Sequence, residues 1–254
     1  MKRTFIFLAA LVLLAGCGKD NDKDLVAQYF FDDDNSINME EYALSRGLVA
    51  YYAFEGTTAD SSANRLHAEV SGNIIAYAGH REGTSSAYFD GNKDNYVYVN
   101  ANDKLKLDVW TINLWFKCTD INYRDGSLIQ MGSQNRSGAF DITPRILYIT
   151  ISNYGEWQWG SINPSDTSWY PTINNWHMIT TQVSGCTVSQ YLDGKHMWTD
   201  NLKADYINRT NSKLYIGIST WEYSFKYPFK GCIDDVRIYN RILSESEIKY
   251  LYKK

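Results

Sequence analysis

Short runs of alternating apolar and polar residues dominate the chain from residue 47 onward. In one run Ile112, Leu114 and Phe116 fall on one face, while Asn113 and Trp115 fall on the other. This period of two is typical of a β-strand that buries one face in a core. The same reasoning predicts strands at residues 47–54, 86–89, 96–99, 111–117, 127–131, 146–152, 176–183, 187–192, 213–218 and 233–239.

Turn residues separate these runs, and helical periodicity is nearly absent between them. Asp90-Gly91-Asn92, Ser184-Gly185 and Asp193-Gly194 each follow a predicted strand. Many short strands without intervening helices predict an all-β sandwich or jelly roll. Only Ser244-Glu245-Ser246-Glu247, a capping-box pattern, predicts a short C-terminal helix.

The first 16 residues have the pattern of a secretory signal peptide. Lys2 and Arg3 precede an apolar stretch that is too short for a permanent membrane span. The following Leu14-Ala15-Gly16-Cys17 resembles a bacterial lipobox, which implies a lipid on Cys17. The alternative is an ordinary cleaved signal in which Cys17 is incidental.

Residues 17–45 are predicted to be the lipidated cysteine and an acidic tether, with one short helix at residues 37–44. The acidic stretch after Cys17 resembles the surface-export signal of Bacteroidetes lipoproteins. We therefore expect an outer membrane lipoprotein that is exposed at the cell surface. Residues 46–254 are predicted to form the folded domain.

Composition supports a globular β protein and argues against a nucleic-acid partner. Hydrophobic residues make up 44% of the 254 residues and aromatic residues 15%, and the net charge is −4 rather than basic. With Cys17 used for the lipid, Cys118, Cys186 and Cys232 remain, so at most one intramolecular disulfide is possible. Their pairing stays open, and their spacing fits no zinc site.

Several segments together resemble one known family. They are Ala87-Tyr88-Phe89-Asp90-Gly91, residues 111–117, Gln190-Tyr191-Leu192-Asp193-Gly194 and the closing run of residues 233–244. In this order they resemble the laminin-G-like (pentraxin-like) branch of the concanavalin A-like lectin/glucanase superfamily, over residues 47–254. The resemblance implies a jelly-roll sandwich of two curved antiparallel sheets. Gln190, at a position where this family is usually apolar, departs from the pattern.

The resemblance also implies a structural calcium ion that joins the two ends of the sandwich. Glu55, Asp60 and Asn64 provide oxygens in the turn after the first strand, and Asp234 begins the last strand. Calcium prefers such oxygen ligands. The alternative is a solvated acidic turn with a salt bridge to Arg237.

No catalytic site is predicted. The superfamily's retaining glucanases carry Glu-x-Asp-x-x-Glu on one strand, because two carboxylates must lie close together. This chain has no such run, no Gly-x-Ser-x-Gly and no His-Glu-x-x-His. His177 follows Trp176 at a strand start and is interpreted as structural.

Glycan recognition needs flat aromatic rings flanked by amide, carboxylate and hydroxyl groups. Six aromatic residues are the candidates, while Trp176 is assigned to the core and Trp115 is left open. Two of the six lie two positions apart, and so on one face if their segment is a strand, and the other four have no obvious core period. The candidates are Trp157, Trp159, Trp169, Tyr170, Trp221 and Tyr223.

These observations predict a surface lipoprotein whose sandwich binds glycan without cutting it and delivers polysaccharide to neighbouring surface proteins. The first alternative is a protein-binding or adhesion module, because laminin-G-like sandwiches also bind proteins through their loops. The second alternative is a glycoside hydrolase or lyase with an unusual site.

Overall fold

The computed structural model describes residues 39–254 except 74, 78–82, 121, 123–125, 133–138, 145–148, 154–155, 161–171, 204, 207, 209–210 and 222–224. The chain divides into two compact units, Met1–Gly47 and Leu48–Lys254. In the first unit, α1 spans Met39–Ser45 and overlaps the predicted helix. Among the described residues, no helix is both long and apolar enough to cross a membrane.

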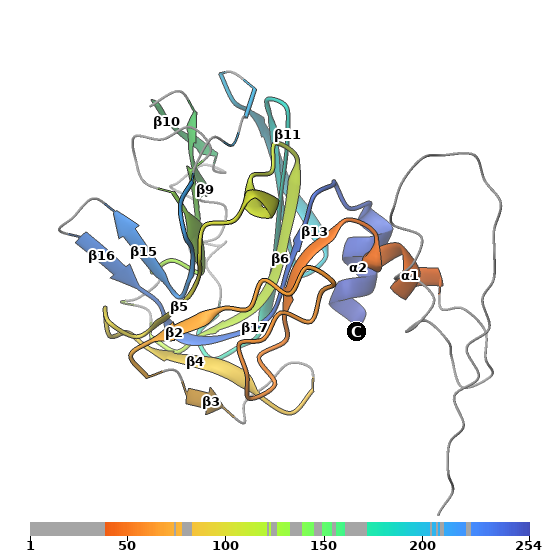
Figure 1. The fold of residues 1–254 in the computed structure, drawn as a ribbon. Coiled ribbons are helices and arrows are strands. Elements are labelled where there is room, and N and C mark those ends of the chain that lie inside the picture. Colours follow the sequence, from red (N-terminus) through yellow and green to blue (C-terminus); the bar gives the residue numbers. More distant parts are fainter. Residues whose placement is uncertain are drawn as a thin grey trace, which may run out of the picture. The chain divides into compact units, whose positions relative to one another are not determined.

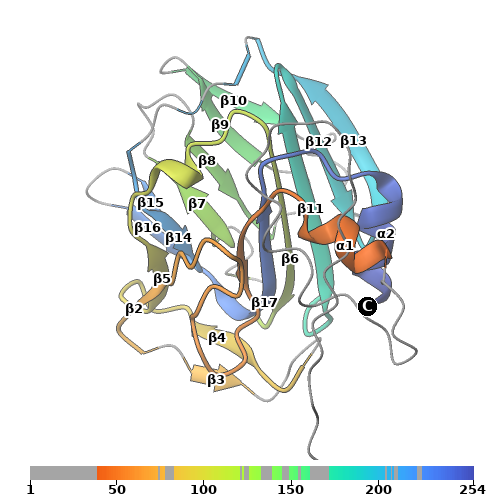
Figure 2. The same cartoon turned by 45° about the vertical axis from the view of Figure 1, so that its right-hand side comes forward.

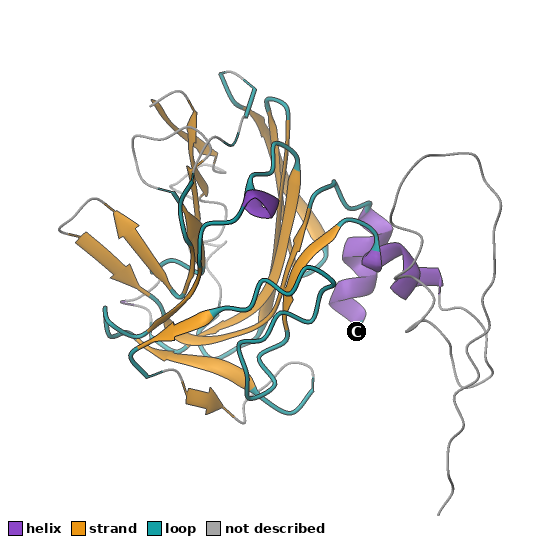
Figure 3. Cartoon of the chain, viewed as in Figure 1, coloured by secondary structure: helices purple, strands orange, loops and turns teal. Residues whose placement is uncertain are grey.

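Two antiparallel sheets form the body of the second unit (Figures 1 and 3). Sheet 1 has the strand order β13-β12-β11-β6-β17-β4-β3, with β1 also paired to β17. Its strands are β1 (Leu48–Tyr52), β3 (Ile75–Tyr77), β4 (Ser86–Asp90), β6 (Trp110–Cys118), β11 (His177–Ser184), β12 (Thr187–Leu192), β13 (Lys195–Asn201) and β17 (Lys230–Tyr239).

Sheet 2 has the strand order β10-β9-β8-β7-β14-β5-β2. Its strands are β2 (Glu69–Ser71), β5 (Tyr96–Val99), β7 (Ile129–Met131), β8 (Ala139–Ile142), β9 (Ile149–Asn153), β10 (Glu156–Gly160) and β14 (Leu214–Ile216). A separate hairpin pairs β15 (Ile218–Trp221) with β16 (Phe225–Pro228). A 3₁₀ helix, η1, spans Asp103–Leu105.

The hydrophobic core lies between the two sheets. It takes Leu114 and Phe116 from β6, Ile233 from β17, and Val97 and Ile129 from sheet 2, and all of these side chains are almost completely buried. The alternation predicted for β6 is therefore confirmed, since its apolar face belongs to this core. The predicted all-β sandwich is also confirmed.

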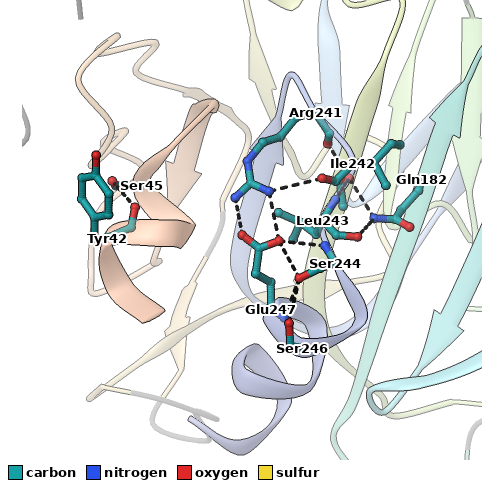
Figure 4. A network of polar contacts seen from close by, with 10 residues as sticks. Tyr42, Ser45, Gln182, Arg241, Ile242, Leu243, Ser244, Ser246 and Glu247 are labelled. Carbon is teal, nitrogen blue, oxygen red and sulfur yellow. Dashed lines mark hydrogen bonds and ion pairs between the residues drawn. The ribbon is translucent and has the colours of Figure 1, made fainter. Parts of the chain in front are cut away.

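Residues 240–254 return across sheet 1 and end in α2 (Glu245–Lys253), which lies beside that sheet in Figure 2. Ser244 caps α2 in a full capping box with Glu247, as predicted. Arg241 Nη2 lies 2.6 Å from Glu247 Oε1 (Figure 4). The Glu247 side chain therefore holds both the turn before α2 and the first turn of the helix.

Glycine allows β14 to bend into the hairpin. Gly217 has φ +82°, and a Cβ atom there would lie 2.2 Å from the ring of Phe89. Only glycine satisfies both the left-handed backbone and the close contact. The hairpin thus leaves sheet 2 at a fixed point beside β7 and β14.

Candidate functional site

The C-terminal segment covers part of the outer face of sheet 1. The Trp115 ring, on this face of β6, stacks on the ring of Tyr252 from α2, with 5.6 Å between centroids and 17° between planes. Gln182 Nε2 donates to the Leu243 carbonyl at 2.8 Å, and Asn113 is fully buried. This face is therefore covered at β6 and β11, and Trp115, whose role the sequence left open, is structural.

The turn after β1 is organised around Asp60, which is 5% exposed. Its carboxylate accepts hydrogen bonds from the amides of Tyr51, Ser62 and Leu66 and from the Ser62 hydroxyl, at 2.7–2.8 Å. Each oxygen accepts two of these bonds, which fills the acceptor capacity of a carboxylate. Asp60 thus ties the loop to β1.

The predicted calcium ligands already accept hydrogen bonds from donors of the protein, an arrangement that does not fit a cation. Asn64 Oδ1 accepts from the ammonium of Lys104 at 2.6 Å, and the Glu55 carboxylate accepts from the Thr84 amide and hydroxyl. Among the described residues, no group of three or more His, Cys, Asp or Glu side chains is arranged to hold a metal. Calcium binding stays a prediction, and it would require these protein donors to be displaced.

The last strand carries a buried ion pair instead of a solvated one. Asp235 lies at a β-bulge with φ +50°, and its Oδ1 lies 2.9 Å from Arg237 Nη2. Tyr51 Oη donates to the same carboxylate at 2.5 Å. Asp234 is fully buried beside this pair, and its carboxylate accepts a hydrogen bond from the Asp235 amide at 2.9 Å. The salt bridge to Arg237 that the sequence offered as an alternative is therefore present, inside the fold.

Sheet 2 presents an exposed aromatic surface, which we call the tyrosine cluster: Tyr96, Tyr98 and Tyr215. The burial pattern of β5 alternates, so Val97 and Val99 enter the core and the two tyrosines point outward, half-exposed. The Tyr96 centroid lies 6.1 Å from that of Tyr98 and 5.8 Å from that of Tyr215. Three neighbouring rings on an open sheet face are an arrangement suited to contact with a flat apolar ligand surface.

Polar groups border the tyrosine cluster on one side. Glu69 is exposed and accepts hydrogen bonds from Tyr98 Oη and from Asn100 Nδ2, each at 2.5 Å. The bond from Tyr98, supported by the bond from Asn100, lowers the pKa of Glu69, and the same bond raises the pKa of Tyr98. The Lys213 ammonium lies 3.8 Å from the centre of the Tyr98 ring. The cluster is thus flanked by a fixed carboxylate, an amide and a cation.

The strand register places the tyrosine cluster in one row with a predicted tryptophan. Directly opposed residues lie on the same face of an antiparallel sheet. The row runs through Glu69, Tyr98, Tyr215, Gln130, Asp141, Thr150 and Trp159, and crosses all seven strands. Trp157 opposes Ser152 in the next row. Trp157 and Trp159 both lie in β10, a strand that the sequence had left as a possibility.

The middle of this row is polar and well ordered by hydrogen bonds. Asp141 Oδ1 accepts from Ser127 Oγ at 2.6 Å, and Gln130 Oε1 accepts from Thr220 Oγ1 at 3.4 Å. Thr220 belongs to β15, so the hairpin borders the row at this point (Figure 1). Gln130 and Asp141 are both buried, with 3% and 5% exposed, so the exposed part of this row lies at the tyrosine cluster.

The other predicted aromatic residues are only partly located. Trp221 is the last residue of β15 and pairs with Phe225. Trp169, Tyr170 and Tyr223 lie outside the described residues. The Lys213–Tyr215 segment belongs to a strand that the sequence predicted. The sequence did not predict that this strand pairs with β5, because that pairing follows from the order of strands in sheet 2.

One aromatic assignment was wrong. Trp176 precedes β11 and is half-buried, with the Lys117 ammonium 5.3 Å from its ring, because a residue at the entry of a strand lies at the rim of the sandwich. Core positions go to Trp110 and Trp198. His177 is held by Asp193 at 2.9 Å and Thr172 at 3.1 Å, as expected for a structural residue.

The thiols of the second unit are reduced. Cys118 and Cys232 are buried, Cys186 is partly buried, and all three are free cysteines. Burial raises the pKa of Cys118 and of Cys232. A thiol held in its neutral form is a poor nucleophile, so neither of these two buried cysteines has the environment of a catalytic one.

The carboxylates in the row are too far apart for glycoside hydrolysis. Glu69 and Asp141 are separated by four strand spacings of ~4.8 Å, or roughly 19 Å. Glycosidase pairs are separated by about 5–9.5 Å. These two residues therefore do not form such a pair.

A family model described as the concanavalin A-like lectin/glucanases superfamily matches residues 89–249, which is more than half of the chain. The chain belongs to this superfamily. The predicted fold class, a jelly-roll sandwich of this superfamily with a short C-terminal helix, is thereby confirmed. No curated protein matches the sequence.

Solved structures with this superfamily fold include several binding domains. Domain 4 of AbnA, a GH43 extracellular arabinanase from Geobacillus stearothermophilus solved with arabinotriose, is similar with a TM-score of 0.66 and 18% identity, over 81% of this chain and 98% of that one. The binding domain of Paraclostridial Mosquitocidal Protein 1 is similar with a TM-score of 0.65 and 18% identity, over 82% of this chain and 52% of that one. The binding domain of botulinum neurotoxin DC, in complex with rat synaptotagmin II, is similar with a TM-score of 0.61 and 16% identity, over 83% of this chain and 52% of that one. At these identities the similarity establishes the fold alone.

Proposed function

We propose that this chain binds glycan without cleaving it, and that the tyrosine cluster on the outer face of sheet 2 is the binding platform. The observation that carries the proposal is the group of three half-exposed tyrosine rings bordered by Glu69, Asn100 and Lys213. Aromatic faces pack on the C–H surface of a sugar ring, and the polar groups around them bind its hydroxyls.

Two further observations support this face over the other. The outer face of sheet 1 is covered at β6 by α2 and the Trp115–Tyr252 stack, so a ligand would have to displace part of the fold there. The related arabinanase domain was solved with an oligosaccharide, which is consistent with sugar binding on this type of sandwich. Trp157 and Trp159 on β10 are proposed to extend the platform, and Trp169, Tyr170, Trp221 and Tyr223 to contribute from the adjoining loops and hairpin.

Our proposal includes the location of the chain. The lipobox-like sequence at Cys17 and the acidic tether support an outer membrane lipoprotein whose sandwich faces outward, where it would capture polysaccharide for neighbouring surface proteins. Mass spectrometry of the purified protein should detect acyl chains on Cys17, and Cys17→Ser should release the protein from the membrane. A Cys17→Ser chain that stays in the membrane would contradict the anchor.

A glycan array probed with the full chain tests the binding proposal. We expect specific binding that is lost in Tyr98→Ala and retained in Tyr88→Ala, a half-exposed tyrosine in β4 of sheet 1. The bound glycan should be recovered uncut. Repeating the array with calcium and with chelator tests the predicted ion, since chelator-sensitive binding would support it.

A protein partner is the alternative outcome. The related toxin domain solved with synaptotagmin II supports it, as do the exposed apolar side chains of Val70 at 43% and Tyr227 at 45%. If no glycan binds in either buffer, the glycan proposal fails. Pull-downs from the cell surface with wild type and Tyr98→Ala would then identify the partner.

A further inference from the structure

Glu69 has the geometry of a group that recognises sugar hydroxyls. A carboxylate offers about four acceptor positions. The Tyr98 hydroxyl occupies one on Oε2, and the Asn100 amide occupies one on Oε1. These two bonds fix the orientation of an exposed carboxylate while one acceptor position on each oxygen still faces solvent. Two adjacent acceptors suit two donors from neighbouring hydroxyl groups.

Charge around the tyrosine cluster favours a neutral ligand. The carboxylate of Glu69 accepts a hydrogen bond from the Tyr98 hydroxyl, the ammonium of Lys213 lies over the Tyr98 ring, and the two charges attract each other. Their charges cancel, so this end of the row offers no net attraction to an anion. A uronate or sulfate group at Glu69 would meet like charge and would bring acceptors where donors are needed.

The exposed part of the row is short. Tyr98 and Tyr215 are half-exposed, but the next two residues along the row, Gln130 and Asp141, are buried, with 3% and 5% exposed. A ligand would therefore contact this row at the tyrosine cluster, beside Glu69.

We infer that the site selects a neutral, hydroxyl-rich glycan, with Glu69 accepting hydrogen bonds from two neighbouring hydroxyls of one sugar unit. This inference rests on the proposed glycan binding and deepens it. It assigns the ligand class and one specificity-determining residue.

Titration calorimetry of the full chain tests the inference. The probes are neutral glucan, mannan and arabinan oligosaccharides from dimer to hexamer, with oligogalacturonates as the anionic set. We expect one neutral series to bind with an affinity that is insensitive to salt. Glu69→Gln should weaken that binding ~10-fold, or about 1.4 kcal/mol, because hydrogen bonds to a charged acceptor are roughly twice as strong as those to a neutral one.

Glu245→Gln is the matched control, because Glu245 is an exposed glutamate on α2 that pairs with Lys249. Its affinity should equal that of the wild type, and thermal melts should show that both variants fold. Unchanged binding in Glu69→Gln, with loss in Tyr98→Ala, would overturn the inference and leave the proposed function standing. Preferential, salt-sensitive binding of oligogalacturonates would overturn the neutral class. Binding of none of these probes or of any arrayed glycan would overturn the proposed function and this inference with it.

Discussion

Asp60 gives a sharp test of how the loop after β1 is held. Its buried carboxylate accepts four hydrogen bonds, three from backbone amides and one from the Ser62 hydroxyl. Asp60→Ala would remove the acceptor and leave the buried donors without partners. We therefore expect a large loss of stability from the removal of this single side chain.

The magnitude follows from the contacts. A hydrogen bond to a charged group contributes about 1.5–3 kcal/mol, but four bonds to one carboxylate do not add, since the loop will relax and admit water. Each buried donor left without a partner costs about 1–3 kcal/mol. We expect Asp60→Ala to lower the free energy of unfolding by about 3–5 kcal/mol, against less than about 0.5 kcal/mol for the exposed Asp200→Ala.

Urea denaturation of both variants and the wild type, in calcium and in chelator, is the assay. If Asp60 acts through its hydrogen bonds, the wild type should have the same midpoint in both buffers. A wild type that loses several kcal/mol in chelator, with Asp60→Ala insensitive to chelator, would refute this reasoning and support the predicted calcium ion. A loss below ~1 kcal/mol in Asp60→Ala would also refute it.

Three further changes test the frame around the site. Gly217→Ala should lower the free energy of unfolding by several kcal/mol, because the new Cβ would meet the Phe89 ring. Gly56 has φ +70° and nothing within 4 Å of a Cβ, so Gly56→Ala should cost only about 1–2 kcal/mol, and urea denaturation compares the two variants. Ser244→Ala should cost about 1 kcal/mol by loss of the capping box, measured by calorimetry. Burial raises the pKa of Glu247, but its hydrogen bonds outweigh burial and lower it overall, so its contribution should be present above about pH 4.5 and lost as pH falls further. Glu247→Gln should flatten that acid limb of the stability curve.

Alternation along the chain was sufficient to predict the long central strands. β5 and β12 have the predicted bounds, and β6 extends its prediction by one residue at each end. These strands bury one face, so their period of two is strong. The capping box likewise predicted α2, because its signal is local.

Short and edge strands were missed for a physical reason. β2 and β3 have three residues each, too few to establish a period, and they exist because β5 and β4 offer hydrogen-bonding partners. β16 ends in Pro228, a residue that argues against a strand in sequence. Its position in a two-stranded hairpin makes the proline tolerable.

The tyrosine cluster shows where sequence reasoning stops. Tyr96 and Tyr98 alternate with buried valines in a predicted strand, so their outward orientation was readable. Tyr215 is more than a hundred residues away in sequence, and only the order of strands in sheet 2 brings β14 beside β5. The tryptophans of β10 were conspicuous as Trp-x-Trp, whereas the tyrosines became a candidate site only through topology.

Hydrogen exchange of the full chain, with and without the best glycan from the array, tests the central claim most directly. Exchange reports ligand protection of individual backbone segments. The account predicts slower exchange in β5, β14 and β7 of sheet 2, and no change in α2 or β13. Protection confined to sheet 1 or α2, with sheet 2 unaffected by a glycan that binds, would contradict it.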